Sequence, residues 1–254
     1  MLRHAAYPAP LTRLPEVAAF VDLHSAGKDY KMVSLVGYNL FNGAELREGD
    51  GALGAAGQAL ARAMALPLVW GHQNEPSRSL ASALNDEKGS RTTLYGAYLA
   101  QKPAVYCETF ATGGIREEDV REYTTGLKRA LRHLGILPPA PDDWAISDGH
   151  LAAGPEPMVT RLDTVDALAP ADGSKASSGH LQSQNLSLVG GLWRAKVDLW
   201  HAVEEGQLVG AVSDLYGEVL FELRAAKAGV VILLRHLARV EPGAFLLVLA
   251  DADE

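Results

Sequence analysis

Cysteine is nearly absent from the sequence, and this limits the chemistry that the chain can use. Cys107 is the single cysteine among 254 residues, so an internal disulfide is excluded. Such sparing use of cysteine is typical of a reducing compartment, and we therefore expect a cytoplasmic protein. Cys107 lies within an apolar run, which favours a role as a core-filling side chain over that of a nucleophile.

Basic residues and long apolar runs are also scarce. Lysine and arginine together number 23 against 31 acidic residues, which gives a formal net charge of −8. The basic residues are scattered, which argues against a nucleic-acid surface because such surfaces need basic patches. No apolar run approaches the ~20 residues of a membrane span, so we expect no membrane partner. Residues 1–15 contain no apolar core of signal-peptide length, and secretion is not indicated.

What the chain does have is the succession of strands and helices that is typical of an α/β domain. Hydrophobic residues make up 48% of it, enough to bury a large core. An acidic first turn, a basic last turn and a following Gly135 predict a helix over residues 117–134. We also predict a helix over 51–66 and strands over 17–21, 30–39, 67–71 and 103–108, with 30–39 lying beside 17–21.

Two of these predicted strands end in residues that carry chemistry. Asp22 and His24 follow the apolar run 17–21, and their spacing places both side chains on one face of a strand. Glu108 ends the run 103–108 in the same way. A neutral imidazole is a good zinc ligand, and a neighbouring carboxylate can move a proton to and from water, so the pattern indicates a metal-assisted hydrolase. The alternatives are a satisfied polar pair at Asp22 and His24, and an ion-paired carboxylate at Glu108.

The last part of the chain contains an internal repeat. Residues 203–214 match residues 240–251 at a constant offset of 37, with valine, glutamate, glycine and a closing aspartate at equivalent positions. Two similar β halves packed on each other would explain this repeat, and the pattern is similar to the barrel-sandwich fold of biotinyl and lipoyl domains. Lys227 has no methionine nearby, so we do not expect it to be the modified lysine of a carrier domain.

Four short segments resemble one known family when they are taken together. They are Val21-Asp-Leu-His24-Ser, Gly89-Ser-Arg91-Thr, Pro103-Ala-Val-Tyr-Cys-Glu108-Thr and Leu131-Arg-His-Leu-Gly-Ile. The set is similar to the succinylglutamate desuccinylase/aspartoacylase family, zinc amidohydrolases with a carboxypeptidase-like fold that remove acyl groups from N-acyl amino acids. The branch that contains the N-acetyl-diaminobutyrate deacetylases of ectoine breakdown is the most similar, and the resemblance covers most of the chain.

The resemblance implies roles for three residues and Zn²⁺ as the cofactor. His24 matches the histidine of the family's D-L-H motif, which is its third zinc ligand. Glu108 matches the catalytic glutamate, which acts first as general base and then as general acid. Arg91 lies where this branch has a G-R-S-L segment, and it would bind the substrate carboxylate through a bidentate pair. A solvated surface arginine is the alternative for Arg91.

The chain departs from the family upstream of D-L-H. The family supplies its first two zinc ligands from an H-x-x-E loop, and the residues before His24 contain no match to it. A catalytic zinc needs about three protein ligands, so we expect the N-terminal part of the enzyme to be missing. His72 and Glu75 form an H-x-x-E further along and would complete a ligand set with His24. A solvated polar loop is the alternative for these two residues.

The expected fold class is α/β, with two parts. A carboxypeptidase-like mixed sheet flanked by helices, N-terminally truncated, would be followed by a smaller all-β domain of barrel-sandwich type. Proline-rich and low-complexity stretches mark the boundaries. We expect a partial zinc-hydrolase domain over 1–138, a linker with the first strands, among them a weak one near 157–162, over 139–180, and the β domain with the repeat over 181–254.

The predicted function is zinc-dependent hydrolysis of the amide bond of N-acyl amino acids, by a truncated form with weak or no activity. The expected partner is a small N-acyl amino acid, with neither nucleic acid nor membrane. The alternative is a non-catalytic binding or assembly protein that retains the family fold. An incomplete sheet would expose an apolar edge, so a homo-oligomer is one option.

Overall fold

The computed structural model describes residues 16–40, 49–73, 93–110, 114–139, 158–160 and 185–250. The chain divides into two compact units. The first, here the α/β unit, comprises Met1–His24, Leu35–Cys107 and Val120–Val159; the second, here the β unit, comprises Ser25–Ser34, Glu108–Asp119 and Thr160–Glu254. The domain boundaries expected after residues 138 and 180 stay predictions, because residues 140–157 and 161–184 lie outside the described residues.

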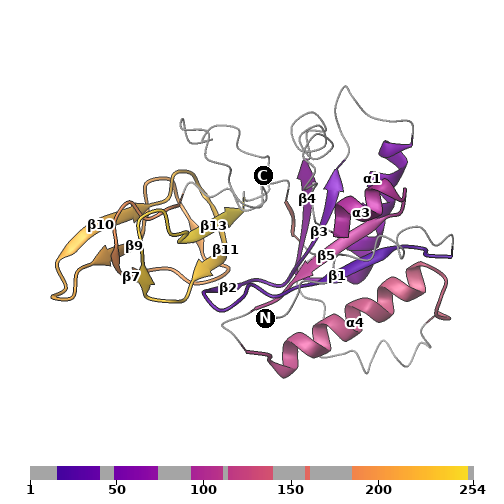
Figure 1. Ribbon diagram of the computed structural model, residues 1–254, viewed down its shortest axis with the longest axis horizontal. Helices are drawn as coiled ribbons and strands as arrows, with labels where there is room; N and C mark the ends of the chain where they lie inside the picture. Colours follow the sequence, from indigo (N-terminus) through magenta and orange to yellow (C-terminus); the bar gives the residue numbers. More distant parts are fainter. Residues whose placement is uncertain are drawn as a thin grey trace, which may run out of the picture. The chain divides into compact units, whose positions relative to one another are not determined.

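The α/β unit is built on a five-stranded sheet (Figure 1). Its strand order is β1 (Phe20–Leu23), β5 (Ala104–Glu108), β3 (Leu35–Leu40), β4 (Leu68–Gln73) and β6 (Met158–Thr160). β1 runs parallel to β5, and β3 runs parallel to β4. The helices are α1 (Asp50–Met64), α3 (Thr93–Leu99) and α4 (Glu117–His133). Together with the β unit this makes a mixed α/β protein with several sheets and few helices.

One apolar cluster joins the sheet of the α/β unit to its two long helices. Leu60 and Met64 of α1 and Ala130 of α4 pack with Val105 and Cys107 of β5 in this cluster. The Cys107 thiol is buried and lies 3.6 Å from the Met64 sulfur, which agrees with the expected core-filling role. The alternating burial of β5 is the reason, since Val105 and Cys107 face the helices while their neighbours along the strand face the other way.

The structure confirms most of the predicted elements of the α/β unit. Both long helices are present within two residues of their predicted ends, and the strands predicted over 67–71, 103–108 and 157–162 correspond to β4, β5 and β6. Gly135 follows α4 with a φ of +70°, the left-handed conformation that a helix-ending glycine adopts at little cost. None of the helices in the described part of the chain is long and apolar enough to cross a membrane.

The prediction of one strand over 30–39 beside 17–21 was wrong. The segment forms two strands, β2 (Tyr30–Met32) and β3, and they belong to different sheets. The neighbour of β1 is β5, which comes much later in the chain, whereas β2 pairs with a strand of the β unit. A continuous apolar run shows that a segment is buried, but it does not show which sheet buries it, and here the chain changes sheets at residues 33–34.

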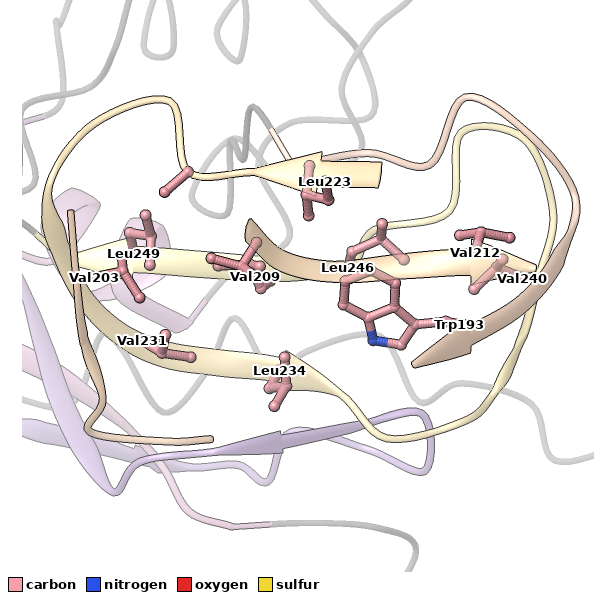
Figure 2. Packing of buried hydrophobic residues seen from close by; sticks show 12 residues of the cluster. Trp193, Val203, Val209, Val212, Leu223, Val231, Leu234, Val240, Leu246 and Leu249 are labelled. Atoms are coloured by element: carbon pink, nitrogen blue, oxygen red, sulfur yellow. The ribbon is translucent and has the colours of Figure 1, made fainter. Parts of the chain in front are cut away.

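The β unit contains two four-stranded sheets (Figure 1). One has the order β10 (Val219–Arg224), β9 (Leu208–Ser213), β7 (Gly191–Ala195) and β12 (Arg239–Val240). The other contains β13 (Leu247–Ala250), β11 (Gly229–Arg235) and β2, with the short β8 (Ala202–Val203) also paired to β11. Figure 2 shows the core of this unit, in which Trp193 lies among aliphatic side chains from both sheets.

The repeated sequence has a repeated structure. Gly206 and Gly243 both have a positive φ, of 79° and 80°, in turns that follow the short strands β8 and β12. Each turn is closed by an equivalent bond: the Gln207 N–H donates to the Glu204 carbonyl at 3.1 Å, and the Ala244 N–H donates to the Glu241 carbonyl at 2.9 Å. We call β7 to β9 the first half and β11 to β13 the second half. β8 of the first half pairs with β11 of the second half, and β12 of the second half pairs with β7 of the first half. The two halves are therefore interlocked by exchanged strands.

Candidate active site

The candidate site begins at the carboxyl ends of β1 and β5. In their parallel register Asp22 lies opposite Tyr106 and Leu23 lies opposite Cys107. The pairing continues beyond the strand, because the His24 N–H donates to the Cys107 carbonyl at 2.8 Å. The carboxyl end of a parallel strand is where open α/β sheets bind ligands. His24 thus directly follows one such strand, and Glu108 is the last residue of its neighbour.

His24 is held by contacts to its side chain and to its backbone. Its Nε2 atom lies 3.0 Å from Asp22 Oδ2, which is the same-face pair that the two-residue spacing predicts. Tyr123 of α4 donates a hydrogen bond from its hydroxyl to the His24 carbonyl. The imidazole itself remains 46% exposed. A half-exposed imidazole whose Nε2 faces a carboxylate still offers Nδ1 to a ligand.

Glu108 is positioned by the alternation along β5. Val105 and Cys107 are buried in the core cluster, whereas Tyr106 and Glu108 lie on the other face of the strand and are half-buried. The Oε2 atom of Glu108 is shielded from solvent. A carboxylate that is half-buried at a strand end is a residue type and position suited to general acid–base work.

The remaining predicted residues lie elsewhere or outside the described part. His72 belongs to β4 and lies opposite Asn39 of β3. β5 and β3 separate β4 from β1, which puts the β1 and β4 backbones roughly 14 Å apart at the usual strand spacing. Glu75 and Arg91 lie outside the described residues. Their roles, and that of His72, stay predictions.

The described residues do not by themselves supply a full zinc site. Within the described ranges, no group of three or more histidine, cysteine or acidic side chains is arranged to hold a metal ion. His24 and Asp22 provide one imidazole and one carboxylate, which is fewer than the three protein ligands of a catalytic zinc. The role of His24 as a zinc ligand therefore stays a prediction.

Tyr123 is a site residue that the sequence pattern did not reveal. It lies 99 residues from His24 in the chain, on the helix whose ends were predicted from its charges. The helical period identifies which side chains share a face, but it does not identify a single hydroxyl that reaches a neighbouring strand end. The amphipathic pattern of α4 was the one available signal.

The described strands and helices define a class: a mixed α/β protein with two neighbouring parallel strand ends that carry His24 and Glu108, together with a β unit that contains a repeat. Solved structures of the succinylglutamate desuccinylase/aspartoacylase family have this fold. A structure of the ectoine utilization protein EutE (DoeB) from Ruegeria pomeroyi with bound product matches 94% of this chain and 60% of its own length, at 20% identity and a TM-score of 0.68. A succinylglutamate desuccinylase from Silicibacter sp. TM1040 matches over 96% and 60%, at 21% identity and a TM-score of 0.68.

A third structure, of a succinylglutamate desuccinylase/aspartoacylase from Rhodobacter sphaeroides, covers 94% of this chain and 59% of its own length at 17% identity and a TM-score of 0.67. The chain thus spans about 60% of the length of these proteins. The predicted resemblance to the family is confirmed at the level of the fold. No protein-family model matches the sequence, and no curated protein matches it either.

Proposed function

We propose that the chain is a hydrolase of the amide bond of N-acyl amino acids, with a carboxypeptidase-like α/β part and a β part of barrel-sandwich type. The observation that carries the proposal is the parallel pairing of β1 and β5, since it makes His24 and Glu108 the residues at two adjacent strand ends. The fold shared with desuccinylases and with an ectoine utilization protein supports the same reading.

Each of the chain's own residues has a defined task in this proposal. Glu108 takes a proton from the attacking water and returns it to the departing amine, which is general base and then general acid catalysis. Arg91 binds the carboxylate of the amino acid through a bidentate pair. Asp22 orients the His24 imidazole through the contact of its Oδ2 with Nε2, and His24 would be one ligand of a zinc ion. Bound zinc would polarise the amide carbonyl and lower the pKa of water.

The small number of zinc ligands limits the zinc affinity and the hydrolysis rate that we expect of this chain. Because His24 alone is fewer than the three protein ligands that a catalytic zinc needs, we expect zinc to bind weakly and the hydrolysis to be slow. His72 and Glu75 are the further ligands to test. The wide separation of β1 and β4 weighs against their joining His24 on one ion.

The test is an activity assay with added zinc on a panel of N-acetyl and N-succinyl amino acids. We expect slow hydrolysis that falls about 100-fold or more in Glu108→Gln, which keeps the shape of the side chain and removes its basicity. Glu204→Gln, an exposed carboxamide substitution in a turn of the β unit, is the matched control and should leave the rate unchanged. A folded chain with no hydrolysis, or with a rate that ignores Glu108→Gln, would refute the proposal.

Zinc binding is measured separately, by titration of the metal-free chain. We expect a weak affinity that His24→Ala abolishes and His72→Ala leaves unchanged. Tight one-to-one binding that is lost in both His72→Ala and Glu75→Ala would instead assign the ligand set to His24, His72 and Glu75. A folded chain without activity would favour the alternative, a non-catalytic assembly protein.

A further inference from the structure

One end of a sheet in the β unit presents an exposed apolar surface. β10 is the end strand of the order β10-β9-β7-β12, so one of its edges has no strand beside it among the described residues (Figure 1). Val219 and Leu220 of β10 are 59% and 49% exposed, and Leu215 and Tyr216 in the preceding turn are 85% and 94% exposed. Strand edges of this kind pair readily with another chain, and exposed apolar patches mark contact surfaces.

The turn that precedes β10 is closed by its own hydrogen bonds. Asp214 Oδ1 accepts hydrogen bonds from the N–H groups of Tyr216 at 2.8 Å and Glu218 at 2.9 Å. The Asp214 N–H also donates to the Glu218 carbonyl at 2.9 Å. A turn that is already ordered loses little conformational entropy on association, so the two apolar side chains at its tip are presented at low cost.

The charges at the ends of β10 are complementary to those of a second copy that runs antiparallel. Glu218 directly precedes the strand and Arg224 ends it, both exposed. Arg224 is held in place by Glu222 at 2.9 Å and by the Gly206 carbonyl at 3.2 Å, and its guanidinium has donors to spare. An antiparallel pair centred on Phe221 places Glu218 of each copy opposite Arg224 of the other.

The same register fixes which residues of the two strands lie opposite each other. It sets Val219 opposite Leu223 of the second copy, Leu220 opposite Glu222, and the two Phe221 residues opposite each other. The ladder of β10 to β9 shifts register between Val219 and Phe221 and between Leu223 and Arg224, so the regular part of the strand is Phe221 to Leu223. A register centred one residue later would place two Glu222 carboxylates opposite each other, which is unfavourable. The other end strand of this sheet, β12, has two residues and offers little edge for pairing. Association through β10 therefore closes at a dimer.

We propose that β10 is a homodimerisation edge, through which two copies of the chain pair antiparallel about a two-fold axis at Phe221. This inference concerns an interaction surface and is independent of the proposed activity.

Sedimentation velocity on charge-reversed variants tests the proposal. We expect the wild-type chain to dimerise, and Glu218→Arg and Arg224→Glu each to weaken the dimer about tenfold or more, because each variant places like charges opposite each other. An equimolar mixture of the two variants should recover the dimer, since every reversed charge then meets its opposite. The mixture is decisive, because loss of a contact within one chain cannot be recovered by mixing.

Two further variants keep the result interpretable. Glu204→Arg makes the same charge change in the turn between β8 and β9 and should dimerise like the wild type. Val219→Lys places a charge on the exposed strand edge that the dimer covers, and it should give a monomer with an unchanged circular dichroism spectrum. A wild-type chain that remains monomeric at its highest soluble concentration overturns the proposal. So does a mixture of the two charge variants that fails to recover the dimer.

Discussion

The Trp193 ring leaves no room for a side chain at Gly210 on the neighbouring strand β9. The ring is buried in the core (Figure 2) and lies against Gly210 of β9. A Cβ atom at Gly210 would approach Trp193 Cη2 to 2.1 Å, which is far inside any normal contact. Gly210→Ala should therefore force the indole out of place and lower the free energy of unfolding by about 1–3 kcal/mol, measured by urea denaturation.

The control for this substitution is Gly51→Ala. Gly51 lies in the first turn of α1, and a Cβ there would meet no atom within 4 Å. Alanine is the better helix former, so this variant should be neutral or slightly more stable. If Gly210→Ala had the same midpoint of urea denaturation as the wild type, the close packing of Trp193 on Gly210 would be contradicted.

The candidate site could be predicted only as far as local spacing determines it. The contact between Asp22 and His24 follows from two residues on one face of a strand, and the position of Glu108 follows from the end of an apolar run. The bond from Tyr123 to the His24 carbonyl joins residues far apart in the chain, and no periodicity encodes it. Long-range contacts depend on how helices and strands pack, which a single sequence does not state.

At the scale of elements, β2 is attached to the β unit by side chains as well as by its ladder to β11. Lys31 forms an ion pair with Asp198, and the Arg235 guanidinium bonds the Tyr30 hydroxyl at 3.3 Å. The Tyr30 ring also packs edge-on against Phe245, with the ring centroids 5.8 Å apart. These contacts explain why the short β2 segment joins the β unit although β1 and β3 on either side of it belong to the other sheet.

The ion pair of β2 makes stability depend on pH. The hydrogen bond from Lys31, helped by the Leu199 N–H, holds the pKa of Asp198 below its ordinary value of 3.8. A depressed carboxyl pKa stabilises the folded state above the ordinary value, and this contribution is lost as the pH falls through the folded pKa. Asp198→Asn should therefore cost up to about 1 kcal/mol at neutral pH, because Asp198 is largely exposed, and nothing in strong acid.

Urea denaturation of both chains across this pH range measures the difference. The control is the same comparison in a Lys31→Met background. There the destabilisation by Asp198→Asn should be smaller, since the hydrogen bond from Lys31 is the main cause of the lowered Asp198 pKa. An Asp198→Asn effect that is equal at neutral and acid pH would rule out the charge on Asp198 as its source.

Helices and strand positions were largely predictable, whereas the strand partners were not. The charges of α4 and the glycine after it encode a helix locally, and the apolar run over 104–108 encodes a buried strand. The pairing of β1 with β5, and of β2 with β11, joins distant segments and depends on the whole core. The repeat was visible in the sequence, but the exchange of β8 and β12 between its halves was not.

At the scale of the whole molecule, the β unit is not contiguous in the sequence. Its strands over 191–250 are completed by β2, which comes from between two strands of the α/β unit. In the ladder Met32 lies opposite Leu233, and both side chains are buried. A fragment of residues 185–250 alone would leave that edge of β11 unpaired and its apolar surface open to water.

A peptide of residues 25–34 should therefore bind this fragment and stabilise it. Stabilisation by a ligand that binds only the folded state grows with its concentration, so the melting temperature of the fragment should rise as peptide is added. The matched control is the same peptide with Met32→Lys, which puts a charge where Met32 is buried and should give little or no rise. Equal effects of both peptides, or none from either, would mean that the β unit does not need β2. A rise with the unmodified peptide alone would establish that the chain builds its second unit from two separate stretches of sequence.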